Sequence, residues 1–161
     1  MGKAVVFLSL LFGSTRTAAQ FTPDVWTVPM RGNSYITRIS KEASQMDASN
    51  RNAALAIVGK NGLILKNDTE SVASAYVYIP VPAHPEIALN VVGSARLDIS
   101  YGAQHFVQDI SNKKMGKVSF GQLDVTQPQY IRIDFRIKDM EAPSYVVVLS
   151  LIHISEPTRP Y

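Results

Sequence analysis

The sequence predicts an all-β protein, a jelly-roll type antiparallel β-sandwich. In residues 130–139, YIRIDFRIKD, apolar and charged side chains alternate, a pattern typical of a strand with one buried and one solvent-facing side. Other short runs rich in β-branched and aromatic residues recur along the chain, separated by prolines and glycines. A helical pattern is almost absent. Such closely spaced strands favour a sandwich or barrel over an α/β fold.

The expected strands, in chain order, are residues 25–30, 34–40, 74–81, 85–93, 95–102, 105–110, 117–125, 130–139 and 144–148. Residues 40–62 are polar and rich in alanine, so they are expected to form an excursion or one short helix ending near Gly59. We favour end-capping of the sandwich over ligand binding as their role. The basic run SNKKMGK, residues 111–117, is expected to be a solvated loop.

Two sets of apolar residues are predicted to face the core: Ile131, Ile133, Phe135 and Ile137 in one strand, and Leu97, Ile99 and Tyr101 in another. Their charged neighbours, Asp98 and Asp134 among them, are then expected to face solvent.

The first 19 residues have the layout of a signal peptide: Lys3, an apolar run from Ala4 to Phe12, and small residues before a cleavage site near Ala19. The run is too short to span a bilayer, which needs about 20 apolar residues. A short buried helix is the alternative. We therefore expect a secreted, periplasmic or cell-surface protein with no membrane span.

The last residues, 149–161, read LSLIHISEPTRPY and end in a segment with two prolines. Residues 149–159 are identical to one reading frame of a transposase-type sequencing adapter, so we interpret 149–161 as translated adapter and predict that it packs poorly. A genuine polar tail is the alternative. The domain then spans residues 20–148, and we expect the natural protein to continue past Val148 into a C-terminal partner domain.

Charge gives no support for a nucleic-acid partner. The chain has 16 basic and 13 acidic residues, and removing Lys3, Arg16, Arg159 and Glu156 with the two ends leaves 13 and 12, a net charge of +1. There is no cysteine, so burial of a core must stabilise the exported domain without disulfides.

No catalytic, cofactor or metal site is predicted. The chain has three histidines: His153 lies in the adapter segment, His84 in a turn, and His105 is left alone. The motif NDTE, from Asn67 to Glu70, offers oxygens for calcium, but asparagine and aspartate also favour turns, and we prefer the turn. We therefore expect a protein that is not an enzyme.

Three segments carry a family resemblance: VPMRGNSYITR, VGKNGLILKNDTESVASAYVYIPVP and LDVTQPQYIRIDFR. Over Val28 to Phe135 the chain resembles an N-terminal β-sandwich domain of unknown function from secreted Bacteroidetes proteins. The resemblance implies a sandwich similar to carbohydrate-binding modules, and it implies no catalytic residues. That family often has a tryptophan where this chain has Leu63, Ile64 and Leu65, which argues against a stacking site there.

A glycan is the partner that the sequence favours, because the apolar C–H face of a sugar packs on an aromatic ring. The candidate stacking residues are Tyr76, Tyr78 and Tyr101, with Asn90 and His105 as hydroxyl partners and Trp26 in reserve. Either the tyrosine side or the Val77 and Ile79 side of that strand must face the core, and the sequence leaves both open. The alternative function is a structural spacer or protein-interaction domain that positions a missing C-terminal domain.

Overall fold

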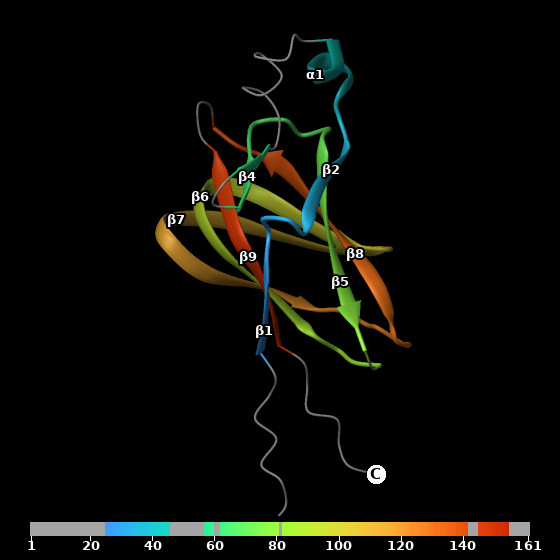
Figure 1. The fold of residues 1–161 in the computed structure, drawn as a ribbon. Helices are drawn as coiled ribbons and strands as arrows, with labels where there is room; N and C mark the ends of the chain where they lie inside the picture. Colours follow the sequence, from blue (N-terminus) through green and yellow to red (C-terminus); the bar gives the residue numbers. More distant parts are fainter. Residues whose placement is uncertain (1–24, 46–56, 60–61, 81, 142–144, 155–161) are drawn as a thin grey trace, which may run out of the picture.

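The structure, a computed structural model, describes residues 25–45, 57–59, 62–80, 82–141 and 145–154. The expected signal peptide and residues 155–161 lie outside these residues. Within them the chain forms one short helix and nine strands: β1 (Val25–Pro29), β2 (Ser34–Arg38), α1 (Lys41–Gln45), β3 (Ile57–Gly59), β4 (Gly62–Leu65), β5 (Val72–Ile79), β6 (Glu86–Tyr101), β7 (Gln104–Gln122), β8 (Gln129–Asp139) and β9 (Val146–Ile154) (Figure 1).

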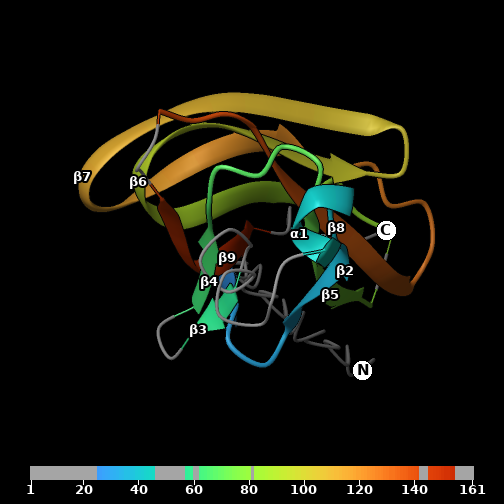
Figure 2. The same cartoon turned by 90° about the horizontal axis from the view of Figure 1, so that it is seen from above.

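All nine strands belong to one antiparallel sheet, in the order β2-β5-β8-β6-β9-β4-β3, with β1 added to β9 and β7 added to β6. One edge of β6 pairs with β7 from Glu86 to Tyr101. Its other edge pairs first with β9 and then, from Arg96 onward, with β8. The sheet therefore curls into a half-barrel around β6, and the predicted all-β antiparallel class is confirmed (Figure 2).

The core lies on the inner side of this curl. Phe135 of β8, Ile99 of β6 and Val148 of β9 are each 0% exposed and belong to one apolar cluster. Because alternate residues of a strand point to opposite faces, β6 and β8 present charged residues such as Arg96 and Arg132 outward. The predicted inward set in β8 is confirmed, since Ile131, Ile133 and Ile137 are buried with Phe135.

Several expected boundaries are wrong. Residues 111–117 are not a loop, because they continue β7 opposite β6. The helix predicted to end near Gly59 is α1, which ends at Gln45, while Ile57–Gly59 forms β3 and pairs with β4. Residues 46–56 lie outside the described part of the chain. Polar composition suggested a loop in 111–117, but an antiparallel partner satisfies the backbone of a polar segment equally well.

The prediction that residues 149–161 pack poorly is wrong for the described part of that segment. Residues 149–154 continue β9, and residues 150–154 pair with β1 on one side and β6 on the other. Leu151 is 1% exposed and joins the apolar core. The physical reason is that the backbone of the segment completes the ladders of β1 and β6, which places the Leu151 side chain in the core. The adapter origin of the segment stays a prediction.

Candidate functional site

Four exposed tyrosines gather on the outward face of three neighbouring strands: Tyr35 of β2, Tyr76 and Tyr78 of β5, and Tyr130 of β8. We call this set the tyrosine face. In β5 the alternation buries Val77 and Ile79, which leaves Tyr76 and Tyr78 42% and 48% exposed. The structure thus decides the orientation that the sequence left open.

The four rings form two pairs. The ring centroids of Tyr78 and Tyr130 are 4.9 Å apart, and these two residues are direct partners across the β5–β8 ladder. The centroids of Tyr35 and Tyr76 are 6.2 Å apart, with an edge-to-face angle of 63°. Both separations lie in the range of favourable aromatic contacts. Mutual packing therefore restrains rings that are otherwise open to solvent, with Tyr130 75% exposed.

A network of polar side chains begins beside the rings. Arg132 lies opposite Tyr76 in the ladder, and its Nη2 donates to Oδ2 of Asp134 at 2.9 Å. The Ser74 hydroxyl donates to Oδ1 of the same carboxylate at 2.6 Å. The Thr37 hydroxyl extends this network, lying 2.6 Å from the Ser74 hydroxyl and 3.3 Å from the carbonyl oxygen of Val72.

Hydrogen bonds restrain the charged side chains of this network. The hydrogen bond from Arg132 to Asp134, followed by the charge of that carboxylate, raises the pKa of Arg132 above its ordinary value, and Tyr76 adds to the effect. Arg132 is therefore a cation at any physiological pH. An arginine donor and a carboxylate acceptor thus lie beside the rings, in an order fixed by the β5–β8 register.

The structure does not bring the remaining sequence-predicted residues to the tyrosine face. Tyr101 points toward the core side, where its hydroxyl accepts a hydrogen bond from Nε2 of Gln129 at 3.2 Å. Asn90 is half-buried in the part of β6 that pairs with β9. Trp26 pairs with His153 between β1 and β9, and its side chain lies outside the described part of the molecule.

Sequence reasoning missed Tyr35 altogether and did not select Tyr130 as a stacking residue. A signal for Tyr130 was present, because it shares the parity of Arg132 and Asp134 in the alternating strand and therefore their outward face. Tyr35 precedes Ile36 in a short strand, and its place depends on the pairing of β2 with β5.

Each of the two histidines whose side chains are described lies beside one aspartate, and Nδ1 of His84 is 3.4 Å from Oδ1 of Asp124. His105 lies on the outward face of β7, and its Nδ1 is 3.2 Å from Oδ1 of Asp98. Lys138 approaches the other carboxylate oxygen at 3.3 Å. Asp98 is only 2% exposed, so the expectation that it faces solvent is wrong. Its position on the outward face is as predicted, but the longer side chains of His105 and Lys138 cover it.

The NDTE motif forms a turn in which Asp68 acts as an acceptor. Oδ1 of Asp68 accepts the backbone N–H groups of Glu70 and Ser71, both at 3.0 Å, and Oδ2 accepts the hydroxyls of Ser40 and Ser71. Burial raises the pKa of Asp68, but the hydrogen bonds together outweigh burial and lower it. Hydrogen-bond donors thus occupy both oxygens, as the preferred turn interpretation requires.

Among the described residues there is no group of three or more histidine, cysteine, aspartate or glutamate side chains that could hold a metal ion. In the same part of the chain no helix is long and apolar enough to span a membrane.

Comparison with protein families finds one match, a family described as "Domain of unknown function (DUF5077)", over residues 28–157. The match includes residues 149–157 of the segment interpreted as adapter. Comparison with the curated proteins gives no match.

Solved structures similar to the chain include carbohydrate-binding modules. The CBM36-1 domain of a multidomain xylanase from the hindgut metagenome of Trinervitermes trinervoides has a TM-score of 0.58 and 10% identity, with 84% of this chain and 100% of that chain covered. A CBM36 module in complex with calcium and xylotriose has a TM-score of 0.54 and 12% identity, with 80% and 98% covered.

A structure of another kind is also similar. The Cry4Aa mosquito-larvicidal toxin of Bacillus thuringiensis has a TM-score of 0.55 and 8% identity, with 83% of this chain and 24% of the toxin chain covered. At such low identity these likenesses show the fold alone, and function must be argued from the site.

Proposed function

The chain belongs to the family of the domain of unknown function DUF5077, and on that premise we propose that it is a non-catalytic carbohydrate-binding module of an exported protein. The observation that carries the proposal is the tyrosine face. The fold of the chain resembles that of carbohydrate-binding modules of glycoside hydrolases. That resemblance is at low identity, so the argument from the residues has to stand by itself.

The tyrosine face has the two kinds of group that a sugar requires. A pyranose has apolar C–H patches that pack on aromatic rings, and hydroxyls that need donors and acceptors nearby. Tyr76 and Tyr78 lie two residues apart on one strand, with ring neighbours Tyr35 and Tyr130 on either side. Four rings across three strands give a platform longer than one ring, which suits an oligosaccharide better than a monosaccharide.

Arg132 and Asp134 supply the polar part of the site. The guanidinium has five N–H donors, of which the bond to Asp134 uses one, so others remain for sugar hydroxyls. Because the pair is already ordered by the hydrogen bonds of Asp134 with Ser74 and Arg132, little side-chain entropy is lost when a sugar binds. Shallow, wet sites of this kind bind in the micromolar to millimolar range, about 4 to 8 kcal/mol.

A protein partner is the alternative, because tyrosine and arginine are also enriched at protein interfaces. In that case the domain is a spacer or interaction module. This alternative predicts that no polysaccharide binds the chain and that the residues of the tyrosine face contact a protein partner instead.

The test is affinity electrophoresis and calorimetry of the chain against plant, host and bacterial polysaccharides, repeated with Tyr76→Ala and Tyr78→Ala. We expect one or more polysaccharides to bind, and each substitution to weaken binding by about tenfold, since stacking on one ring is worth roughly 1 kcal/mol or more. Tyr101→Phe is the control, because its ring faces inward and lies off the tyrosine face. Circular dichroism verifies that each variant is folded.

Two outcomes contradict the proposal in different ways. If no polysaccharide binds, the spacer or protein-interaction function replaces glycan binding. If a polysaccharide binds equally well to Tyr76→Ala, Tyr78→Ala and the unmodified chain, the function stands but the site is elsewhere.

A further inference from the structure

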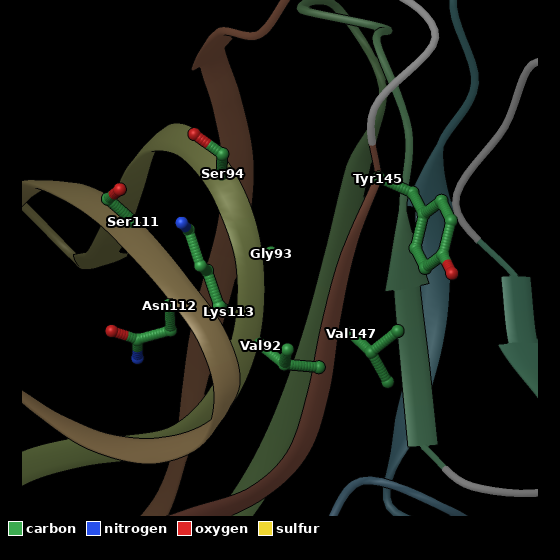
Figure 3. A pocket seen from close by; sticks show the side chains of 8 residues that line it. All are labelled: Val92, Gly93, Ser94, Ser111, Asn112, Lys113, Tyr145 and Val147. Atoms are coloured by element: carbon green, nitrogen blue, oxygen red, sulfur yellow. The ribbon is translucent and has the colours of Figure 1, made fainter.

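A second site lies where the sheet divides. The last pair between β6 and β9 is Gly93 with Val146, and the first pair between β6 and β8 is Arg96 with Asp139. Between Gly93 and Arg96, β6 stops pairing with β9 and begins to pair with β8. The β6–β7 pair of strands separates from β9 at this point. A groove of about 560 Å³ opens there, on the outward face of the sheet (Figure 3). This volume is in the range of small-molecule sites.

The two sides of the groove differ in chemistry. Ser94 of β6 and Ser111 of β7, which are ladder partners, line one side together with Lys113. The ring of Tyr145 stands on the other side, and Val92 and Val147 lie between them (Figure 3). A molecule in the groove thus meets hydroxyls and an ammonium group on one side and an aromatic ring on the other.

Backbone geometry holds the two sides in place. Gly93 has a φ of +124°, and a Cβ on it would lie 2.4 Å from the carbonyl oxygen of Tyr145 and 2.9 Å from Cα of Val146. The segments at Gly93 and at Tyr145 and Val146 approach this closely only because residue 93 is glycine. Nδ2 of Asn112 donates to the carbonyl of Val91 at 3.2 Å, which connects β7 to β6 beside Lys113 where their register shifts.

The charge of the groove is unbalanced. Of the described residues that line the groove, Lys113 is the one that carries a charge. Lys113 makes no ion pair with any described residue. The hydroxyls of the neighbouring serines can each donate and accept hydrogen bonds. A ligand that fits has a negative charge for Lys113, hydroxyls for the serines and an apolar face for Tyr145.

We propose that this groove binds a negatively charged saccharide, with Tyr145 stacking on the sugar ring and Lys113 pairing with its carboxylate or sulfate. The site goes beyond the proposed function of the tyrosine face. It lies on the part of the sheet formed by β6, β7 and β9, whereas the tyrosine face lies on β2, β5 and β8. Neither site needs the other to be occupied.

The test uses a galacturonic acid trimer as the charged probe and its fully methyl-esterified form as the uncharged one, with calorimetry at low and at 0.5 M added salt. A sulfated galactose trimer serves as a second charged probe and shows whether charge or the carboxylate itself is recognised. We expect the acid to bind about fivefold more tightly than the ester at low salt, because one exposed charge pair contributes that much. Added salt is expected to reduce this preference.

The variants assign the effect to the groove. Lys113→Gln is expected to abolish the preference for the acid, while Lys114→Gln leaves it unchanged, because Lys114 is exposed and does not line the groove. Tyr145→Ala is expected to weaken binding of acid and ester alike by about tenfold. Val107→Ala, at an exposed residue that lines neither the groove nor the tyrosine face, is expected to leave both unchanged.

Three results would overturn the proposal. One is that neither charged probe binds. Another is that Lys113→Gln and Lys114→Gln reduce the preference equally, which means a diffuse positive surface. A third is that Tyr76→Ala removes binding of the acid while Tyr145→Ala does not, which places all sugar binding on the tyrosine face.

Discussion

The ring of Phe106 packs directly over Gly121, although both residues belong to β7. A Cβ on Gly121 would lie 2.7 Å from Cε1 of Phe106 and 2.8 Å from its Cδ1, closer than real contacts allow. The two residues are far apart along the strand, so β7 curls enough for its two ends to approach each other on the inner side (Figure 2). The half-barrel shape therefore depends on a glycine at position 121.

Gly121→Ala is expected to destabilise the fold by about 2 to 4 kcal/mol, because it adds a clash with Phe106 to the strain of a φ of +139°. Gly102→Ala is the matched control. It has a positive φ of +57°, in the left-handed region where an L residue is less strained than at +139°, and meets no atom within 4 Å, so it gives the cost of a positive φ without a clash. Urea denaturation measures both. Equal losses of stability would show that the Phe106 contact does not restrict residue 121.

Phe135→Ala is expected to lower the free energy of unfolding by about 3 to 5 kcal/mol, because the side chain is 0% exposed at the centre of the core. Val107→Ala on the outward face of β7 is the control. Val107 is 41% exposed, and its truncation is expected to change stability by less than about 0.5 kcal/mol. If Phe135→Ala were as mild as the control, β8 would be oriented with its other face inward.

Leu151→Ala tests whether the segment interpreted as adapter contributes to folding. Leu151 is 1% exposed, so its truncation is expected to cost about 2 to 5 kcal/mol, whereas Leu149→Ala, at a residue 37% exposed, costs less than about 1 kcal/mol. Thermal unfolding of the two variants gives the comparison. A negligible effect of Leu151→Ala would mean that residues 149–154 do not pack in β9. Sequencing through the junction in the source DNA tests the adapter origin separately.

Asp68 is expected to make stability depend on pH. Its pKa is lowered in the folded protein from the usual value of 3.8, so its ionised form stabilises the fold above that pH, and this contribution is lost as the pH falls through the folded pKa. Asp68→Asn is expected to cost about 1 to 2 kcal/mol at pH 7.

The difference between Asp68→Asn and the unmodified chain should shrink below about pH 4. Urea denaturation at pH 7, 5 and 3 measures it. Asp109→Asn is the control, because the Asp109 side chain is 81% exposed and its ion pair with Arg96 spans 3.9 Å. A difference between Asp68→Asn and the unmodified chain that is constant from pH 7 to pH 3 would contradict the assignment.

The sequence by itself determined the class of the fold and most of the core. Alternation in YIRIDFRIKD separates Ile131, Ile133 and Phe135 from Arg132 and Asp134 without any tertiary information, because one side of the strand is charged and must face water. Composition alone likewise limits the chemistry, because three histidines and no cysteine leave few side chains for a metal centre or a nucleophile.

Only the tertiary structure decided which side of β5 faces out, since tyrosine, valine and isoleucine all suit a core. Pairing with β8 settles it: Tyr76 lies opposite Arg132 and Val77 opposite Ile131, so the charged side of β8 carries the tyrosines outward with it. Strand pairing likewise decides whether Asp98 and Leu151 are buried. Both depend on strands distant in sequence that cover them, and local periodicity has no information about those neighbours.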